Sequence, residues 1–241
     1  MAISRRLVLA WLIAGVPSGL SMVLSYWALQ YINSGVAAVF LGLAPMFTGL
    51  LAWACLNDRP SAKELAYVTL GLVGLLIIFQ DSFQSGHFDW LGMSAAIAAV
   101  LMMAVGAVML KRFGCDLPAD AINNGALLVR ALITGSAWLL SGAPLPTQMP
   151  SNLACGATLY MAVIGSVVAF TVHIRLMQTY RPITCSSIFV ITPAFALWLG
   201  HSLNAEVVSS HMIVGTGMVL FGLALFLMQQ QRRQLGLLKV A

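Results

Sequence analysis

Long apolar stretches separated by short polar connectors run through the whole chain. A helix needs about 20 mainly apolar residues to cross a bilayer, and such windows recur from near the first residue almost to the last. The predicted helices cover residues 7–32, 35–56, 65–80, 90–110, 121–141, 153–177, 183–203 and 211–228. The connectors carry Gly, Pro, Asn and Asp, which favour turns. The pattern predicts an all-α integral membrane protein with about eight transmembrane helices.

Composition strengthens this prediction and excludes other classes. The chain has 241 residues, of which 60% are hydrophobic and 8% charged, whereas soluble domains are about 25% charged. The net charge is +5, but no basic stripe interleaved with aromatic residues indicates a nucleic-acid partner. The four cysteines form no CxxC pair and no metal-ligand spacing, so neither a metal nor a cofactor is expected. The expected partners are the lipid bilayer and a small-molecule substrate, and a homodimer stays open.

The basic residues predict the orientation of the helices. The opening "MAISRRLVLAWLIAG" has a basic start and an apolar run without a clear cleavage site, which indicates an uncleaved first helix. If the N-terminus is cytoplasmic, ten basic residues all lie on the cytoplasmic side, as the positive-inside rule requires. They are Arg5, Arg6, Arg59, Lys63, Lys111, Arg112, Arg181, Arg232, Arg233 and Lys239. We therefore expect a multi-pass protein of the plasma (inner) membrane with both termini in the cytoplasm.

The chain contains an internal repeat. The segment "VFLGLAPMFTGLLAWACLND" (39–58) aligns without gaps with "SIFVITPAFALWLGHSLNAE" (187–206), so that Pro193 follows Pro45 by 148 residues. The same spacing carries Ser18 onto Ser166, and the first three predicted helices onto the last three. Each copy stands five places after its original in the order of helices, an odd number, so the copies cross the membrane in opposite directions. Inverted repeats of this kind are typical of secondary transporters.

Two longer segments resemble a known family. "YWALQYINSGVAAVFLGLAPMFTGLLAWACLNDRPSAKELAYVTLGLVGLLI" is similar to the closing three helices of an EamA module of the drug/metabolite transporter superfamily, and "VIGSVVAFTVHIRLMQTYRPITCSSIFVITPAFALWLGHSLNAEVVSSHMIVGTGMVLFGLAL" is similar to the same part of a second module. The resemblance implies two inverted modules around a central cavity. It places a partial first module of three helices at 1–81, a second of five helices at 88–230, and a cytoplasmic tail at 231–241.

The family pattern has ten helices, and this chain is similar to a member that begins at the third. Either the start is truncated or misassigned, or the eight-helix form is a genuine variant, which another subunit could complete. The resemblance implies a transporter that exports small metabolites, such as amino acids or related compounds, or drugs by alternating access. The alternative is an accessory membrane subunit or a nonfunctional truncated fragment. An enzyme is not expected, because the chain offers no HExxH, no evident Ser/His/Asp set and no paired intramembrane acids.

Several intramembrane residues are candidates for a substrate cavity. Arg130 falls near the middle of its predicted helix, where an arginine is costly and therefore a functional candidate that could attract a substrate carboxylate. Ser18 and Ser21 lie on one helical face, and prolines free backbone carbonyls that a cavity can satisfy. The cavity candidates are Ser18, Ser21, Tyr26, Pro45, Arg130, Ser166, Phe170 and Pro193. His173 is the candidate for proton coupling, although proton antiport and downgradient exchange both stay open.

Each candidate also has a structural reading. Serines in membrane helices often bond to their own preceding carbonyls, and proline kinks often serve packing alone. Arg130 could instead pair with carbonyls or reach toward the inner face, and His173 could be a hydrogen-bonded packing residue. Aromatic residues such as Tyr26 and Phe170 equally suit interfacial anchoring or packing.

Overall fold

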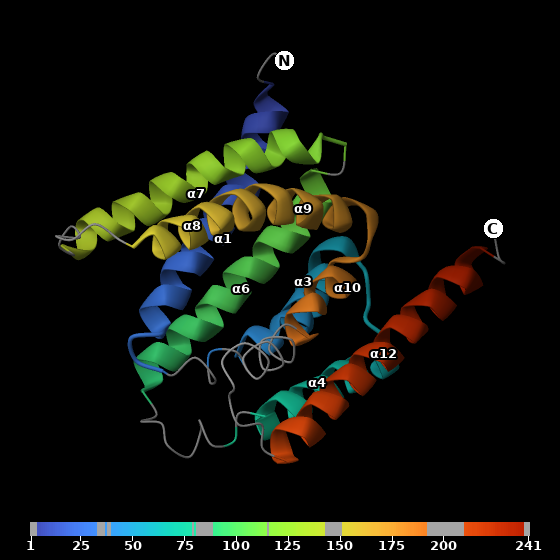
Figure 1. The fold of residues 1–241 in the computed structure, drawn as a ribbon. Coiled ribbons are helices and arrows are strands. Elements are labelled where there is room, and N and C mark those ends of the chain that lie inside the picture. Colours follow the sequence, from blue (N-terminus) through green and yellow to red (C-terminus); the bar gives the residue numbers. More distant parts are fainter. Residues whose placement is uncertain are drawn as a thin grey trace.

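The computed structural model describes residues 4–32, 37, 40–78, 80, 89–114, 116–142, 151–191 and 210–238. Every regular element in these ranges is a helix (Figure 1). The elements are α1 (Arg5–Ala28), α3 (Ala44–Leu56), α4 (Ala62–Ile78), α6 (Trp90–Phe113), α7 (Ala119–Ser141), α8 (Asn152–Tyr160), η1 (Met161–Ala169), α9 (Phe170–Thr179), α10 (Pro182–Ser186) and α12 (Ser210–Leu238). The all-helical architecture predicted from the sequence is confirmed for this part of the chain.

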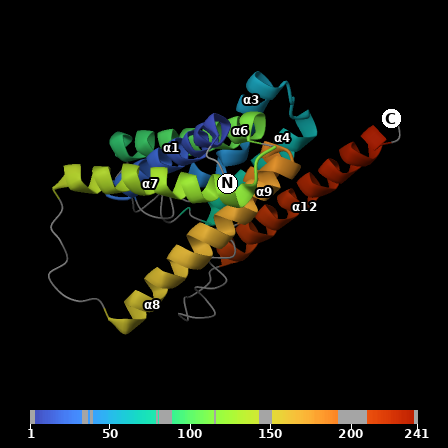
Figure 2. The same ribbon diagram turned by 90° about the horizontal axis from the view of Figure 1, so that it is seen from above.

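Within the described ranges, three helical stretches are long and apolar enough to cross a membrane. They are α1, α6 and the continuous run Asn152–Thr179, which joins α8, η1 and α9 (Figure 2). Shorter apolar helices cover Phe40–Leu56, Pro182–Ile191 and Ile213–Gln229. The last of these belongs to α12, which continues to Leu238 instead of ending near 228. Gln, Arg and Leu are good helix formers, so the predicted tail extends the helix.

Small residues let α1 pack closely against α6 and α7. A Cβ added at Gly125 of α7 would lie 2.0 Å from a ring carbon of Trp11, so the indole lies directly on the backbone of that helix. The indole Nε1 donates a hydrogen bond of 2.8 Å to the Ala121 carbonyl. At Gly15 of α1, an added Cβ would lie 2.6 Å from Val129. Close approach through glycine is the usual way in which membrane helices associate, and here it holds α7 against α1.

The repeat-related helices α4 and α12 cross at a pair of repeat-related glycines. They lie side by side in both ribbon views (Figures 1 and 2), packed along much of their length. A Cβ added to Gly74 of α4 would lie 2.7 Å from the carbonyl oxygen of Gly215 on α12. A Cβ added to Gly222 of α12 would lie 2.8 Å from the carbonyl oxygen of Tyr67 on α4. Gly222 follows Gly74 by 148 residues, so the internal repeat coincides with this backbone-to-backbone contact.

Pro45 lies at the start of a helix. Residues 40–42 are helical, Leu43 forms a turn, and α3 begins at Ala44 with Pro45 in its first turn. Proline is tolerated there, because the first amide groups of a helix have no intrahelical partner. The predicted helix 35–56 is therefore interrupted at Leu43 within its described part. Pro193, the repeat counterpart of Pro45, lies outside the described residues.

Candidate functional site

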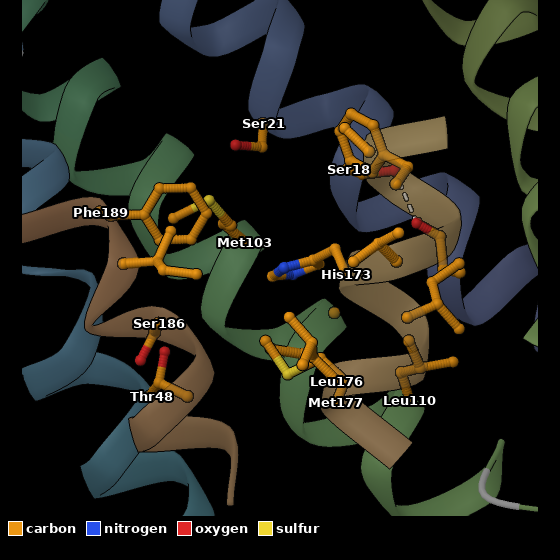
Figure 3. Close-up of a pocket in the computed structure, with 18 of the residues that line it drawn as sticks. Ser18, Ser21, Thr48, Met103, Leu110, His173, Leu176, Met177, Ser186 and Phe189 are labelled. Atoms are coloured by element: carbon orange, nitrogen blue, oxygen red, sulfur yellow. Dashed lines mark hydrogen bonds between the residues drawn. The ribbon is translucent and has the colours of Figure 1, made fainter. Parts of the chain in front are cut away.

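One cavity of about 540 Å³ opens among the helices of both repeats (Figure 3). This volume falls within the range of roughly 300–1,000 Å³ that is usual for small-molecule sites. Among the described residues, its polar lining consists of Ser18 and Ser21 from α1, Thr48 from α3, Arg130 from α7, His173 from α9 and Ser186 from α10. Much of its apolar lining comes from Met103, Leu110, Phe170, Leu176, Met177 and Phe189. The site is an apolar chamber with a few hydrogen-bonding groups and one permanent charge.

Arg130 supplies that charge. The residue is only 6% exposed, and its Nε donates to the Ser18 Oγ at 3.2 Å. The guanidinium carbon lies 4.0 Å from the centre of the Phe170 ring, in cation–π contact. No aspartate or glutamate in the described ranges forms an ion pair with it, and its two terminal nitrogens make no hydrogen bond there. Because an arginine stays protonated in proteins, the cavity holds a positive charge without a protein counterion among these residues.

The hydroxyl of Ser18 is fixed so that it can accept from Arg130. Its Oγ donates to the Ala14 carbonyl at 2.6 Å, one turn earlier on α1. A hydroxyl has one proton and two lone pairs, so this bond leaves the oxygen free to receive the Nε proton. The predicted alternative for the serines, bonding to their own helix, therefore holds for Ser18 together with its place in the cavity lining.

His173 lies in the middle of the chamber. Figure 3 shows its imidazole between Ser18 on one side and Thr48 with Ser186 on the other. The ring meets Phe170 and Phe189 edge to face, with centroid separations of 6.5 and 6.1 Å. These contacts orient the imidazole without an acidic partner among the described lining residues. Its two ring nitrogens are available for a ligand or a proton.

Asn123 fixes the helix that carries Arg130 against the helix that carries His173. Its Nδ2 donates to the Ser166 carbonyl at 3.2 Å, the Val167 carbonyl at 3.1 Å and the Thr171 hydroxyl at 3.0 Å. Ser166 and Val167 belong to the π-helical segment η1, in which hydrogen bonds span five residues instead of four. Asn123 is fully buried, so these bonds lock α7 onto the run Asn152–Thr179.

The structure brings five of the nine predicted site residues together. Ser18, Ser21, Arg130, Phe170 and His173 all line the cavity. The other four are not among its described lining residues. Tyr26 is 65% exposed near the end of α1; Pro45 is buried in the first turn of α3; the Ser166 hydroxyl lies 3.4 Å from the Met161 carbonyl; and Pro193 falls outside the described residues.

Thr48 and Ser186 line the cavity but were not predicted. Both lie within about one turn of a helix-starting proline, Pro45 in α3 and Pro182 in α10. The repeat spacing pairs Thr48 with Ala196 and Ser186 with Ala38. A search for polar residues at matched repeat positions therefore passes over both of them. Their position about one turn after a helix-starting proline is the sequence signal by which they could have been identified.

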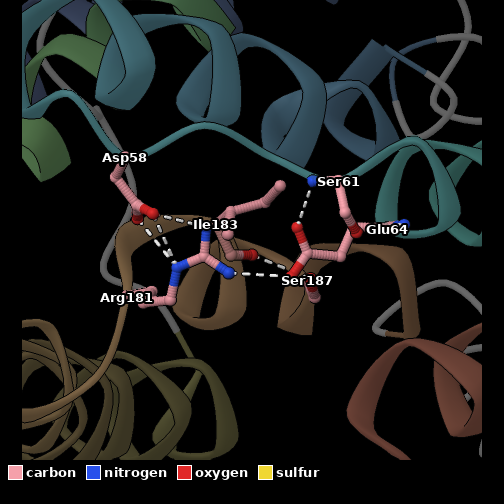
Figure 4. Close-up of polar contacts among 6 residues, drawn as sticks. All are labelled: Asp58, Ser61, Glu64, Arg181, Ile183 and Ser187. Carbon is pink, nitrogen blue, oxygen red and sulfur yellow. Dashed lines mark hydrogen bonds and ion pairs between the residues drawn. The ribbon is translucent and has the colours of Figure 1, made fainter. Parts of the chain in front are cut away.

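A cluster outside the cavity joins the two repeats through charge (Figure 4). Arg181, between α9 and α10, forms ion pairs of 2.6 Å with Asp58 and 2.7 Å with Glu64. Glu64 also accepts from the Ser61 amide at 2.7 Å while the Ser61 hydroxyl accepts from the Glu64 amide at 3.2 Å, a capping box at the start of α4. Burial by itself lowers the pKa of Arg181, but its bonds and proximity to Asp58 and Glu64 raise that pKa above its ordinary value.

Comparison with known proteins identifies relatives of the chain. The model of the EamA-like transporter family matches residues 2–80 and 90–228. Protein PagO of Salmonella typhimurium is 24% identical over 75% of this chain and 60% of that protein. The uncharacterized inner membrane transporter YedA of Escherichia coli K12 is 26% identical over 81% of this chain and 62% of its own length. The S-adenosylmethionine/S-adenosylhomocysteine transporter of Chlamydia trachomatis is 24% identical over 89% of this chain and 68% of its own length.

The fold has a solved counterpart as well. A crystal structure with 17% sequence identity superposes with a TM-score of 0.78 and covers 92% of this chain and 77% of that one. The chain thus spans 60% and 62% of the length of PagO and YedA. The family description and the relatives named for an activity indicate transporters and not enzymes, as the sequence predicted.

Proposed function

We propose, since this chain belongs to the EamA-like transporter family, that it moves small molecules across the membrane by alternating access through the cavity around Arg130. The observation that carries the proposal is the origin of the cavity wall. Ser18 and Thr48 come from the first repeat, whereas His173 and Ser186 come from the second. A site at the interface of inverted repeats is exposed to opposite sides when one repeat rocks against the other.

The proposed direction is export, with small metabolites such as amino acids or related compounds, or drugs, as the cargo. The proposed location is the inner membrane with both termini in the cytoplasm. One relative is named as an inner membrane transporter, and one as a transporter of S-adenosylmethionine and S-adenosylhomocysteine, which supports a small organic cargo. The basic residues of the connectors support the orientation.

The proposed coupling residue is His173. Its ordinary pKa lies near neutrality, and its imidazole stands inside the chamber where a substrate would bind (Figure 3). Proton antiport would use this imidazole as the carrier, whereas downgradient exchange would not need it. Replacing His173 with Asn would abolish transport driven by a pH gradient in the first case and leave exchange intact in the second.

The proposal is tested by reconstituting the purified chain into liposomes and measuring efflux of labelled amino acids and other small metabolites. A tryptophan in place of Ala107, which lines the cavity, should block transport by filling it. Ile97→Trp is the matched control, because Ile97 lies on the same helix and is 36% exposed.

The expected result is efflux above that of empty liposomes for the parent chain and Ile97→Trp, and none for Ala107→Trp. Equal transport by both variants would exclude this cavity as the route. No transport by the parent chain, with a monodisperse preparation, would contradict the proposal and favour the accessory-subunit alternative.

A further inference from the structure

We propose that, among the small metabolites and drugs named above as cargo, the cavity selects a monovalent organic anion with an apolar body in preference to a zwitterion such as an amino acid, or to a cation. This inference rests on the proposed function, because it names the substrate class of the same cavity. It follows from the charge balance at Arg130, from the absence of acidic groups in the described lining, and from the apolar walls on which a ligand would pack.

The charge balance requires a ligand with one negative charge. Arg130 is 6% exposed, and its hydrogen bond goes to a neutral hydroxyl, that of Ser18. A buried charge is costly until a counterion pairs with it. One carboxylate of a ligand can bond to the two terminal nitrogens of a guanidinium at once. Such an anion would neutralise Arg130 and satisfy the donors that the described residues leave without a partner.

The same balance disfavours positive groups. Within the described lining, no carboxylate is present to pair with an ammonium group. The hydroxyls of Thr48 and Ser186 could accept from it, but neither oxygen carries a charge. An ammonium would also share a low-dielectric chamber with the Arg130 guanidinium, where like charges repel strongly. A zwitterion therefore gains binding free energy at its carboxylate and loses binding free energy at its ammonium group. A cation has only the unfavourable contribution.

The apolar walls determine the body of the ligand. Phe170 holds the guanidinium over its ring. Phe189 and Met103 lie next to each other in Figure 3, and the Phe189 ring meets the His173 ring edge to face. Leu110, Leu176 and Met177 add to the apolar lining. Aromatic rings and methionine sulfur pack well against an unsaturated or aromatic body. A ligand bound through its carboxylate at Arg130 would pack its body on these apolar side chains.

The test uses three ligands with one skeleton. Hydrocinnamate carries only a carboxylate, phenethylamine only an ammonium, and phenylalanine both, on the same phenylethyl body. Binding to the purified chain in lipid nanodiscs is measured by calorimetry and by the shift in thermal unfolding. We expect hydrocinnamate to bind about tenfold or more tightly than phenylalanine, and phenethylamine not to bind, because one charge-assisted pair is gained or lost.

Two variants test the role of Arg130. Arg130→Gln should weaken hydrocinnamate binding by about tenfold or more, whereas Arg112→Gln should leave it unchanged. Arg112 is exposed at the end of α6 and is not among the cavity-lining residues, so it controls for the loss of one positive charge. If Arg130→Gln fails to fold, the comparison of the three ligands on the parent chain still decides the question.

Each outcome supports or overturns the inference. Equal binding of phenylalanine or phenethylamine, no binding of hydrocinnamate, or full retention of its binding by a folded Arg130→Gln would overturn it. Equal stabilisation by chloride would overturn the claim that an apolar body is recognised. Binding does not require transport, so hydrocinnamate binding without efflux would leave the inference standing and contradict the proposed function. Efflux of amino acids without hydrocinnamate binding would support the proposed function and overturn the inference.

Discussion

Two arginines that are largely buried differ in their charge partners. Arg181 lies between Asp58 and Glu64 at 2.6 and 2.7 Å and joins the second repeat to the first. Arg130 has a serine hydroxyl and a phenyl ring, and no carboxylate in the described part of the chain pairs with it. A compensated charge of this kind holds elements together, whereas an uncompensated one is a cost that a ligand can relieve. The contrast suggests a structural role for Arg181 and a binding role for Arg130.

The largest expected effect comes from removing the compensated arginine. Arg181→Gln removes the ion pair to Glu64, which is fully buried, and should lower the free energy of unfolding by about 3 kcal/mol. Chemical unfolding in detergent micelles measures the loss. Arg112→Gln is the control and should change stability by less than about 0.5 kcal/mol.

The loss of stability in Arg181→Gln should be independent of pH over a wide range. A pKa of Arg181 that is raised in the folded state means that its contribution is complete below the ordinary pKa of arginine and is lost only as pH rises through the higher folded value. As far as the titration of Arg181 is concerned, the difference in free energy of unfolding between the parent chain and Arg181→Gln should stay constant through the neutral and mildly alkaline range. A gap that closes within that range would contradict the assignment of the cluster.

A smaller effect is expected from Glu64→Gln, which keeps a side chain able to cap α4 but removes one charge. We expect a loss of about 1–2 kcal/mol, because Arg181 retains Asp58. In the double variant with Arg181→Gln, the losses should be less than additive by about 1 kcal/mol. Strict additivity in this cycle would show that Arg181 and Glu64 do not interact. It would contradict the structural role assigned to Arg181.

Arg130→Gln should have a still smaller effect on stability, within about 1 kcal/mol of the parent chain and of either sign. Removing an uncompensated buried charge leaves no carboxylate unpaired among the described residues, so the cost of lost contacts is offset by relief of the charge. Thermal unfolding of the ligand-free protein measures the change. A loss as large as that of Arg181→Gln would mean that Arg130 is structural.

The smallest expected effect comes from Phe170→Leu, which keeps the charge but removes the ring beneath it. We expect hydrocinnamate binding to weaken by about 0.5–1 kcal/mol, the typical size of a cation–π contact. Calorimetry on the nanodisc sample resolves a change of this size. Phe221→Leu serves as the control, since Phe221 is exposed on α12 and is absent from the cavity lining.

The sequence singled out some of the cavity-lining residues and missed others for a physical reason. Arg130 was identifiable because a charge within an apolar run is costly wherever the helix packs. Ser18 was found through helical spacing and the repeat, and His173 through the near-neutral ordinary pKa of histidine. Thr48 and Ser186 were missed, because their repeat counterparts are alanines. The Arg181 cluster was missed as well, although the capping box at Ser61 and Glu64 is visible in the sequence.

By itself, the sequence determined the helical class, the membrane environment and the inverted repeat. Each of these depends on hydropathy and similarity along the chain, which every segment carries regardless of its neighbours. Only the tertiary structure decided that Ser18 supports Arg130, that Phe170 lies under the guanidinium, and that Asp58 and Glu64 belong to Arg181. The residues of these pairs are between 40 and 123 positions apart, and their meeting depends on helix crossings set by glycine contacts such as Gly125 with Trp11.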